Sequence, residues 1–234
     1  MIRVSSDIEA LAAGSSGDLV VVVDVVRAFT TACVLFDRGV GEIVCVRDQA
    51  EAGELGRDDG IGMIVGELEA GDPAPEVVPN SPSAVARLDS VPRRVAMFTL
   101  NGTRVLHQLA SAAVVLAASA ANAGATARWI LAHAPGSRIH LVATDPDGPE
   151  DLACACYLAA LLRGAPVDRA ATEKELAAAR RAHWDRWGRI VTREKWAAAE
   201  ADFEICARLD TYPIVIVADV SGPHPVLRAA RGDI

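Results

Sequence analysis

Seven short runs of β-branched and aliphatic residues recur along this chain, and segments with helical spacing separate most of them. The runs are Leu19–Val25, Glu42–Arg47, Met63–Glu67, Arg94–Thr99, Ala113–Ala118, Ile139–Ala143 and Pro213–Ala218. Runs that are apolar throughout, rather than at alternate positions, are typical of strands buried on both faces of a parallel sheet. Strands that alternate with helices therefore predict an α/β fold, a layered α/β/α sandwich around a mainly parallel or mixed sheet.

The stretch from about residue 163 to residue 210 differs from the rest, because it is rich in alanine and highly charged. We expect two helices there, broken near Trp187-Gly188-Arg189. An earlier helix is expected to place three apolar residues on one face, Leu152, Cys156 and Leu161. A chain of 234 residues fits one domain that spans residues 1–234, or two closely packed α/β halves.

The charge of the chain argues against two classes of partner. Its 23 basic and 31 acidic side chains give a formal net charge of -8, and no block of basic residues occurs. Nucleic acid and anionic membranes are therefore not expected as partners. If the ligand is an anion, local groups must attract it, such as a few arginines, helix N-termini or a metal ion.

The sequence predicts a cytoplasmic location. No signal peptide is evident at its start, and no apolar run reaches the roughly 18–20 residues that a membrane span needs. The five cysteines are odd in number, and the Cys154/Cys156 pair has no second pair or histidine cluster beside it. Neither a disulfide framework nor a zinc site is indicated, so buried thiols in a reducing compartment are expected.

Polar residues cluster where the predicted strands end. Asp24 and Arg27 follow the first run, Glu67 closes the third, and the segment 101–104 follows the fourth. Further polar residues follow the fifth and sixth runs, namely Ser119, Asn122 and Asp151. Because the carboxyl ends of parallel strands gather at one edge of an open sheet, where ligands bind, these residues are expected to converge on one site.

Each of these signals also has a purely structural interpretation. Side chains that commonly cap helices account for five positions, Asn80, Ser81, Asn101, Ser119 and Asn122, with Pro82 suited to the first turn of a helix. Acidic residues in a first helical turn, Glu150 and Asp151, suit the helix dipole. Asp24 and Arg27 need partners because they lie beside a buried strand, and an internal ion pair is the structural alternative for them.

Several common catalytic arrangements are absent from the sequence. Neither the glycine-rich dinucleotide motif nor the P-loop motif occurs, and no G-x-S-x-G elbow is present. Asp24 is not followed by the second acid that phosphoaspartyl chemistry usually needs, because Val26 occupies that position. The five histidines form no spaced pair, so a histidine metal site is not expected.

Seven motifs follow one another along the chain. They are DVVRAFTTA (24–32), GE (66–67), NSP (80–82), TLNGTR (99–104), SAANAGATA (119–127), EDLACA (150–155) and DFEICARLD (202–210). In this order and at about this spacing, they resemble the 2-phosphosulfolactate phosphatases of the ComB type over nearly the whole chain. The sequence is therefore identified as a divergent member of that family.

The resemblance implies a magnesium-dependent phosphatase acting on 2-phospho-3-sulfolactate, or a related small phospho-acid, in the route to coenzyme M. It implies Asp24, Arg27 and Glu67 as catalytic residues, and Asp24, Glu67 and Asp151 as the hard oxygen ligands that Mg²⁺ prefers. The substrate-binding residues that it implies are Thr30, Thr31, Asn80, Ser81, Asn101, Gly102, Thr103, Arg104, Ser119 and Asn122. A homo-oligomer is compatible with it.

The chemistry of such a substrate fits several of these residues. Phosphate, carboxylate and sulfonate on three carbons demand cations and oriented N–H donors. Arg27 and Arg104 carry guanidinium groups that bind oxyanions with two N–H groups at once. Gly102 lacks a side chain, so the backbone at the start of its helix can approach an oxyanion.

The sequence departs from the family pattern at several positions. Phe29 and Leu100 stand where the family usually has threonine, and Ser83-Ala84 stands where a glutamate is often found. The segment 75–79 replaces one that contains an acid, for which Glu76 is a candidate substitute. Because polar groups are lost and apolar groups gained, two alternatives stay open. One is a different reaction on a small anionic metabolite, and the other is an inactive anion-binding protein.

Overall fold

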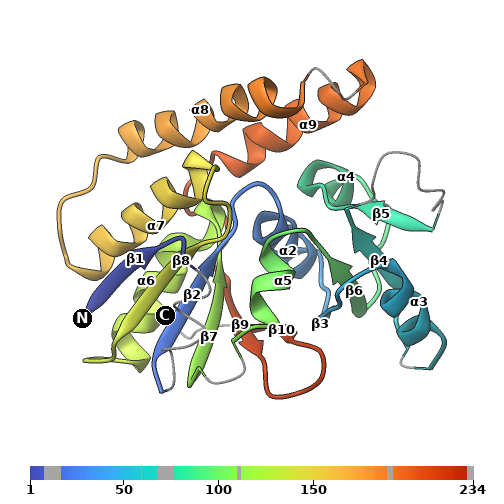
Figure 1. Cartoon of the computed structure of the whole chain (residues 1–234), viewed down its shortest axis with the longest axis horizontal. Coiled ribbons are helices and arrows are strands. Elements are labelled where there is room, and N and C mark those ends of the chain that lie inside the picture. The colour runs from blue at the N-terminus through green and yellow to red at the C-terminus, as the bar shows by residue number, and fades with distance from the viewer. Residues whose placement is uncertain (8–16, 59, 68–75, 110–111, 189–191, 231–234) are drawn as a thin grey trace.

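The fold is built around one mixed sheet, seen in Figure 1. The computed structural model describes all residues except 8–16, 59, 68–75, 110–111, 189–191 and 231–234. Ten strands join in the order β1-β8-β2-β7-β9-β10-β3-β6-β4-β5. Their bounds are β1 Ile2–Ser5, β2 Leu19–Val23, β3 Glu42–Cys45, β4 Met63–Gly66, β5 Val77–Pro79, β6 Arg94–Phe98, β7 Val114–Ala118, β8 Ile139–Ala143, β9 Val215–Asp219 and β10 Val226–Ala230.

The sheet consists of two parallel halves joined by an antiparallel hairpin. Strands β1, β8, β2 and β7 run parallel to one another, and so do β3, β6, β4 and β5. Between the halves, β9 is antiparallel to β7 and to β10, and β10 is antiparallel to β3. The mixed and mostly parallel sheet predicted from the apolar runs is therefore confirmed, and the hairpin reverses the strand direction from one half to the other.

Helices cover both faces of this sheet, which confirms the layered α/β/α fold. Their bounds are α2 Ala28–Asp37, α3 Gln49–Asp58, α4 Pro82–Ala86, α5 Gly102–Leu106, α6 Ala123–His133, α7 Pro149–Leu162, α8 Arg169–Trp187 and α9 Arg193–Cys206, with a short 3-10 helix at Ala120–Asn122. In β2, Val20 and Val22 pack into the core beneath α2 and α5, whereas Leu19, Val21 and Val23 pack beneath α6 and α7. A strand buried on both faces has no reason to alternate with polar residues.

Helix α2 lies between the two halves, as Figure 1 shows, and the buried cluster around it contains side chains from both of them. Val22 of β2 and Val95 of β6 belong to the same buried cluster as Phe29 of α2. Helix α2 therefore packs against both halves of the sheet. Phe29, which replaces a threonine of the family pattern, fills this core and does not line a pocket.

All seven predicted strands are present, and the sequence analysis missed β1, β5 and β10. These three are short or lie at an edge or in the hairpin, and most of their residues are partly buried or exposed, so their apolar pattern is weak. The two helices predicted around the break at Trp187-Gly188-Arg189 are α8 and α9. Residue 189 itself lies outside the described residues.

The expected buried face of α7 was wrong. Leu152 and Cys156 are exposed, whereas Cys154, Leu158 and Leu162 pack against the sheet. Almost every position of α7 is apolar, so spacing alone could not choose the face. All five cysteines are free, and all except Cys156 are buried.

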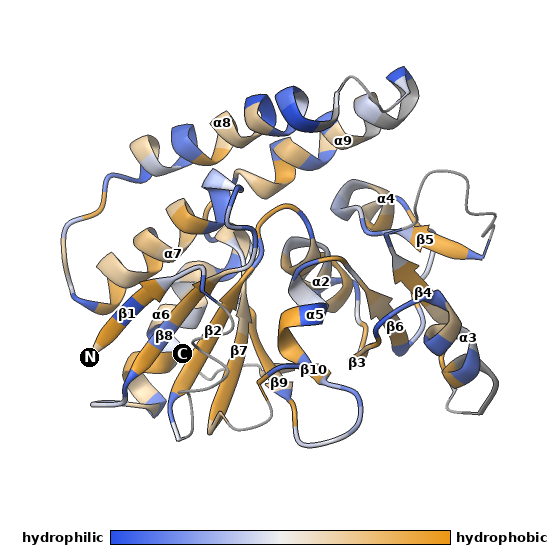
Figure 2. Ribbon diagram, viewed as in Figure 1, coloured by the Kyte–Doolittle hydropathy of each residue, from blue (hydrophilic) through white to orange (hydrophobic). Residues whose placement is uncertain are grey.

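Helices α8 and α9 form a hairpin that lies over α7 at one end and reaches α4 at the other (Figure 1). Figure 2 shows the central strands in the hydrophobic colour, whereas α8 carries long hydrophilic stretches. The hairpin buries a few apolar side chains beneath this hydrophilic surface, among them Leu176 of α8 and Cys206 of α9, which belong to the core cluster under α6 and α7. Within the described residues, no helix has the length and apolar character needed to cross a membrane.

Candidate active site at the ends of β2, β4 and β6

Asp24 follows β2 directly and is nearly buried, with 4% of its surface exposed. Its Oδ1 accepts a hydrogen bond of 3.0 Å from the backbone N–H of Ala28, in the first turn of α2. Burial, followed by the neighbouring charge of Glu67, raises the pKa of Asp24 to about 7, although the backbone N–H groups of Ala28 and Gly102 oppose the rise. A carboxylate in this position is short of positive charge.

Gly102 allows this carboxylate to pack against the start of α5. A Cβ atom added to Gly102 would lie 2.8 Å from Oδ2 of Asp24 and 2.9 Å from Cβ of Ala28. Real side-chain carbons do not approach other atoms so closely, so only glycine fits between α2 and α5 at this point. The glycine of the Asn-Gly-Thr-Arg motif therefore sets the distance between β2 and the turn after β6.

Glu67 lies on the other side of the same turn. Its Oε1 accepts a hydrogen bond of 2.9 Å from Nδ2 of Asn80, and its Oε2 accepts one of 2.9 Å from the backbone N–H of Leu100. Asp24 and Glu67 come from different halves of the sheet, yet both contact the turn at residues 99–102. The structure thus brings these two acids together as expected, although the strands that they follow run in opposite directions and do not share one parallel edge.

Arg27 does not form the internal ion pair with Asp24 that the sequence left open. Its Nη1 instead donates to Oδ2 of Asp202 on α9, at 3.2 Å. Asp202 is 1% exposed, and its Oδ1 accepts hydrogen bonds from Oγ of Ser81 at 2.7 Å and from the backbone N–H of Ser83 at 3.0 Å. The sequence could not show that Asp202 is the partner of Arg27, because it does not reveal that α9 packs over α4.

The Asp202 contacts join three parts of the molecule. Arg27 follows β2 in one half, Ser81 caps α4 in the other half, and Asp202 belongs to the α8–α9 hairpin. A guanidinium group has five N–H donors, and Asp202 takes one of them. The arginine is therefore held in place with donors left over for a ligand.

Asp151 is buried in the first turn of α7, where each of its oxygens is occupied. Oδ1 accepts from the backbone N–H of Val25 at 2.7 Å, and Oδ2 accepts from Oγ1 of Thr144 at 3.0 Å and from the backbone N–H of Asp145 at 3.1 Å. Burial, followed by the charge of Asp24, raises the pKa of Asp151. These contacts fasten the end of β8 to the end of β2, which favours a positioning role over the predicted role as a metal ligand.

Glu150, the residue before Asp151, was interpreted from the sequence only as a favourable charge in a first helical turn. It is 1% exposed, and its Oε1 accepts a hydrogen bond of 2.8 Å from Nε2 of His183 on α8. Its Oε2 is buried and has no hydrogen-bond partner among the described residues. The one available sequence signal was its place beside Asp151, at the end of a predicted strand.

Several predicted substrate ligands are buried and bonded within the protein. Oγ1 of Thr30 donates to the carbonyl of Val25 at 2.7 Å, and Oγ1 of Thr103 accepts from the backbone N–H of Thr99 at 2.8 Å. Thr31 is buried in α2, and its Oγ1 has no partner among the described residues. These placements favour structural roles for Thr30 and Thr103.

Ser119 and Asn122 together form a capping box at the start of the 3-10 helix, which agrees with their structural interpretation, although the side chain of Asn122 does not cap α6. Oγ of Ser119 accepts from the backbone N–H of Ala121 at 3.3 Å, and Oδ1 of Asn122 accepts from the backbone N–H of Ser119 at 2.8 Å. Both are fully buried. Ser81 likewise caps α4, whereas the side chain of Asn101 makes no capping bond to α5.

The exposed members of the predicted site lie on the turn after β6. Asn101 and Arg104 are exposed, and Leu100 is 64% exposed. Within the part of the chain that the structure describes, no acid pairs with Arg104. Glu76 precedes β5 and is exposed, while Pro75 lies outside the described residues. Asn101 and Arg104 are thus available to a ligand that reaches this turn.

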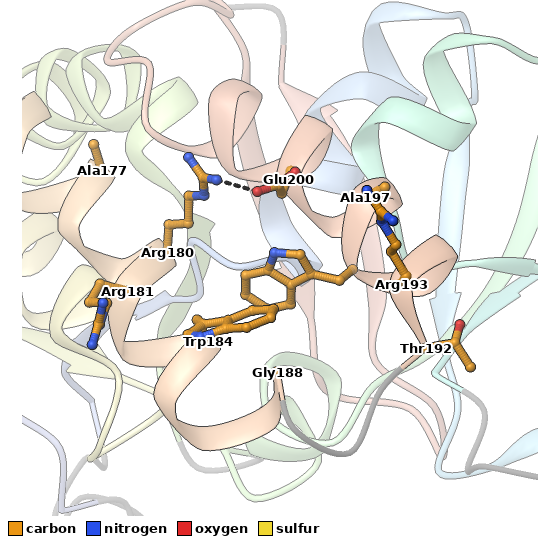
Figure 3. A pocket seen from close by; sticks show the side chains of 10 residues that line it. Ala177, Arg180, Arg181, Trp184, Gly188, Thr192, Arg193, Ala197 and Glu200 are labelled. Atoms are coloured by element: carbon orange, nitrogen blue, oxygen red, sulfur yellow. Dashed lines mark hydrogen bonds and ion pairs between the residues drawn. The ribbon is translucent and has the colours of Figure 1, made fainter.

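An open groove of about 950 Å³ lies elsewhere, between α8 and α9 (Figure 3). Its walls include Trp184 and Trp196, whose ring centroids are 4.6 Å apart, and an ion pair between Arg180 and Glu200 that Figure 3 draws as a dashed line. None of the residues that line it belongs to the predicted site. The groove is therefore a feature of the hairpin and is separate from the Asp24–Glu67 site.

Among the described residues, no group of three or more His, Cys, Asp or Glu side chains is arranged to hold a metal ion. Mg²⁺ needs fewer, because one or two carboxylates usually suffice when water and substrate phosphate complete the octahedron. Asp24 and Glu67 are carboxylates of this kind. Beside them, Oδ1 of Asn80 is buried and lacks a hydrogen-bond partner among the described residues. These acceptors fit a small divalent cation.

The comparison with known proteins agrees with the motifs. A family model described as 2-phosphosulpholactate phosphatase matches residues 7–220. The chain belongs to this family. The resemblance inferred from the motifs is thereby confirmed, and so is the expectation of an enzyme of the phosphoric monoester hydrolase class.

Curated relatives support the same assignment to the 2-phosphosulpholactate phosphatase family. The chain is 30% identical over 230 residues to a probable 2-phosphosulfolactate phosphatase of Synechococcus sp. strain RCC307, which covers 88% of this chain and 91% of the relative. A protein of the same name from Synechococcus sp. strain WH7803 is 30% identical over 250 residues, covering 98% and 97%. Another from Bacillus subtilis strain 168 is 30% identical over 165 residues, covering 66% and 68%.

Proposed function

We propose that this chain is a magnesium-dependent phosphatase that hydrolyses 2-phospho-3-sulfolactate, or a closely related phospho-acid, to the hydroxy acid and phosphate. The observation that carries the proposal is the meeting of Asp24 and Glu67, from opposite halves of the sheet, at the turn that begins with Thr99. Family membership supplies the reaction class, and the relatives named above carry the name of this substrate.

Asp24 and Glu67 would hold the cation, with the amide oxygen of Asn80 beside them. A bound Mg²⁺ would neutralise charge on the phosphoryl oxygens and act as a Lewis acid there. Asp151 keeps Val25, and hence Asp24, in place through its hydrogen bond to the backbone. The cation proposal thus uses two of the three acids first implied by the resemblance and assigns the third a positioning role.

The anionic groups of the substrate would be bound by the guanidinium of Arg27, held by Asp202, and by that of Arg104 on α5. In the reaction a water oxygen forms a bond to phosphorus, the bond between phosphorus and the ester oxygen breaks, and the ester oxygen leaves with a proton as a hydroxyl group. Positioning and charge stabilisation supply most of the catalysis in phosphoryl transfer, and this site is built for both.

The test is phosphate release from synthetic 2-phospho-3-sulfolactate by purified protein with Mg²⁺, after chelation, and after Mg²⁺ is restored. We expect turnover with Mg²⁺, its loss with chelator and its return with the metal. Turnover that persists after thorough chelation would refute the metal role. No turnover with any small phospho-acid would refute the phosphatase assignment.

A second candidate substrate follows from Leu100. Its side chain is 64% exposed beside the backbone N–H that binds Glu67, where the family pattern usually has threonine. An exposed leucine at a binding site contacts an apolar group better than a sulfonate. A phospho-acid with an apolar substituent, such as phospholactate, belongs in the same assay. A higher kcat/KM for phospholactate than for phosphosulfolactate would establish the divergent specificity.

The wider setting is also part of the proposal. Five free cysteines support a reducing, cytoplasmic location. A formal net charge of -8 supports small molecules rather than nucleic acid as ligands. A place in the route to coenzyme M rests on the family resemblance, and a homo-oligomer stays an expectation that measurement of the molar mass in solution would test.

A further inference from the structure

Glu150 is a buried acid that the proposed mechanism does not yet use. Glu150 is 1% exposed, and its Oε1 accepts a hydrogen bond of 2.8 Å from Nε2 of His183. The other oxygen, Oε2, is buried without a hydrogen-bond partner among the described residues. A carboxylate oxygen left unpaired in the interior is costly, so a cation or a proton donor is expected to face it when the protein is at work.

The position of Glu150 places it beside the proposed cation site. Asp151, the next residue, is bonded to the backbone N–H of Val25, which directly follows Asp24. The first turn of α7 is therefore fastened to the end of β2. The charge of Glu150 is among the causes that raise the pKa of both Asp24 and Asp151, which is consistent with a shared neighbourhood.

The two adjacent acids differ in what is left for a ligand. Both oxygens of Asp151 are occupied by donors of the protein, two backbone N–H groups and the hydroxyl of Thr144. Glu150 has one oxygen tied to His183 and one unpaired. Of the two acids, Glu150 is therefore the one with an oxygen left to coordinate an ion or to accept a hydrogen bond from the water molecules around it.

Two basic side chains near the site are bonded to acids other than Glu150. The guanidinium of Arg27 binds Asp202, and that of Arg186, on the same face of α8 as His183, binds Asp145 at 2.8 Å. A second unpaired oxygen, Oδ1 of Asn80, lies on the Glu67 side of the site. Among the described residues, buried acceptors without partners thus occur on residues next to both proposed ligands, Glu150 near Asp24 and Asn80 bonded to Glu67.

We propose that Glu150 is a further carboxylate of the cation site, accepting hydrogen bonds from the water shell of the divalent ion, and that His183 is a positioning residue that holds it. The inference rests on the proposed function. It gives the α8–α9 hairpin a part in the site, because His183 approaches Glu150 from α8 just as Asp202 approaches Arg27 from α9.

The experiment is calorimetric titration of the metal-free protein with Mn²⁺, a divalent probe that also prefers oxygen ligands, together with thermal unfolding of each variant. Glu150→Gln should weaken Mn²⁺ binding about tenfold or more, as is usual when groups that support metal ligands are lost. Glu54→Gln, on the exposed surface of α3, is the matched control and should bind as the wild type does.

Two variants of His183 separate positioning from general stability. His183→Gln keeps an N–H donor for Glu150, whereas His183→Leu fills similar space without one. We expect His183→Leu to weaken Mn²⁺ binding and His183→Gln to restore much of it. Equal Mn²⁺ affinity in both variants, or wild-type affinity in Glu150→Gln, would overturn the inference.

The outcomes also distinguish this inference from the proposed function. If the wild type binds Mn²⁺ and hydrolyses its substrate while Glu150→Gln binds Mn²⁺ equally well, only the role of Glu150 fails. If the wild type binds no divalent ion, the cation site itself fails, and the inference falls with it. If Glu150→Gln does not fold, the two His183 variants provide the test, because weaker Mn²⁺ binding by His183→Leu than by His183→Gln supports the role of Glu150 and equal binding overturns it.

Discussion

Replacing Gly102 with alanine tests the geometry on which the proposed site depends. The added Cβ would lie 2.8 Å from Oδ2 of Asp24 and 2.9 Å from Cβ of Ala28. Neither neighbour can retreat easily, because Asp24 is nearly buried and Ala28 is fixed in the first turn of α2. Gly102→Ala must therefore push α5 away from β2, or turn the Asp24 carboxylate out of position.

The expected cost follows from two opposing terms. Overpacking a well-filled interior typically costs about 1–3 kcal/mol. Alanine regains up to about 1 kcal/mol over glycine in a helix, and less at its first residue. A net loss of about 1–2 kcal/mol corresponds to a fall in Tm of roughly 2–8 °C for a protein of this size. Phosphatase turnover should fall by more than this stability loss explains, because the displaced group is Asp24.

Gly53→Ala provides the matched control. Gly53 lies inside α3, and among the described residues no atom beyond its own stretch of helix backbone lies within 4 Å of a Cβ built on it. This variant should be more stable than the wild type by roughly 0.5–1 kcal/mol and should keep full activity. Urea unfolding and initial rates of phosphate release, measured on both variants, give the comparison. A Gly102→Ala protein with wild-type stability and turnover would refute the close approach of α5 to Asp24.

Three further predictions concern the charged groups. Arg27→Lys should raise KM with little change in Tm, since lysine keeps the charge without the planar fork. Arg27→Ala should raise KM and also lower the free energy of unfolding in urea by about 1.5–3 kcal/mol, because it removes a charged partner of Asp202. Unchanged KM in both variants would contradict a role for Arg27 in anion binding. Asp202→Asn should alter KM for substrate more than Ser83→Ala does, and equal effects would show that Asp202 acts only as architecture. In metal-free protein, the pKa of Asp24 is raised from 3.8 to about 7, so between these pH values the folded state binds more protons than the unfolded state. The free energy of unfolding, compared with that of Asp24→Asn, should therefore fall by up to about 4 kcal/mol as the pH rises from about 4 to 7. Parallel pH profiles of unfolding free energy for the two proteins would refute the raised pKa.

The fold class could be read from the sequence because burial on both faces leaves a local mark. Leu19–Val23 is apolar at every position, and the structure shows why, since alternate residues enter the cores on opposite sides of the sheet. Strands with that mark were all predicted. Strands at an edge, such as β1 and β5, carry no such mark, because half of their surroundings are not core.

The candidate site was predictable to the extent that it depends on strand ends. Asp24, Glu67 and the turn at 99–102 were singled out because each follows an apolar run, and the structure brings them together. What the pattern could not supply was the path of the sheet between them. The reversal of direction at β9 and β10 depends on the pairing of β9 with β7 and of β10 with β3, strands that lie far apart in the chain.

Pairings between distant side chains were decided by tertiary structure alone. A single sequence indicates that Arg27 needs a partner, because burying a charge without one is costly. It shows Glu150 only as a favourable charge in a first helical turn. It does not identify Asp202 or His183 as the partners. Asp202 begins one of the seven motifs, but both residues lie on helices of a highly charged stretch, and the pattern does not show what these helices pack against. The sequence by itself determined the layers of the fold, the positions of the strand ends and the need of a buried charge such as that of Arg27 for a partner. Packing the α8–α9 hairpin over both halves decided which groups provide it, because contact in three dimensions does not depend on separation along the chain.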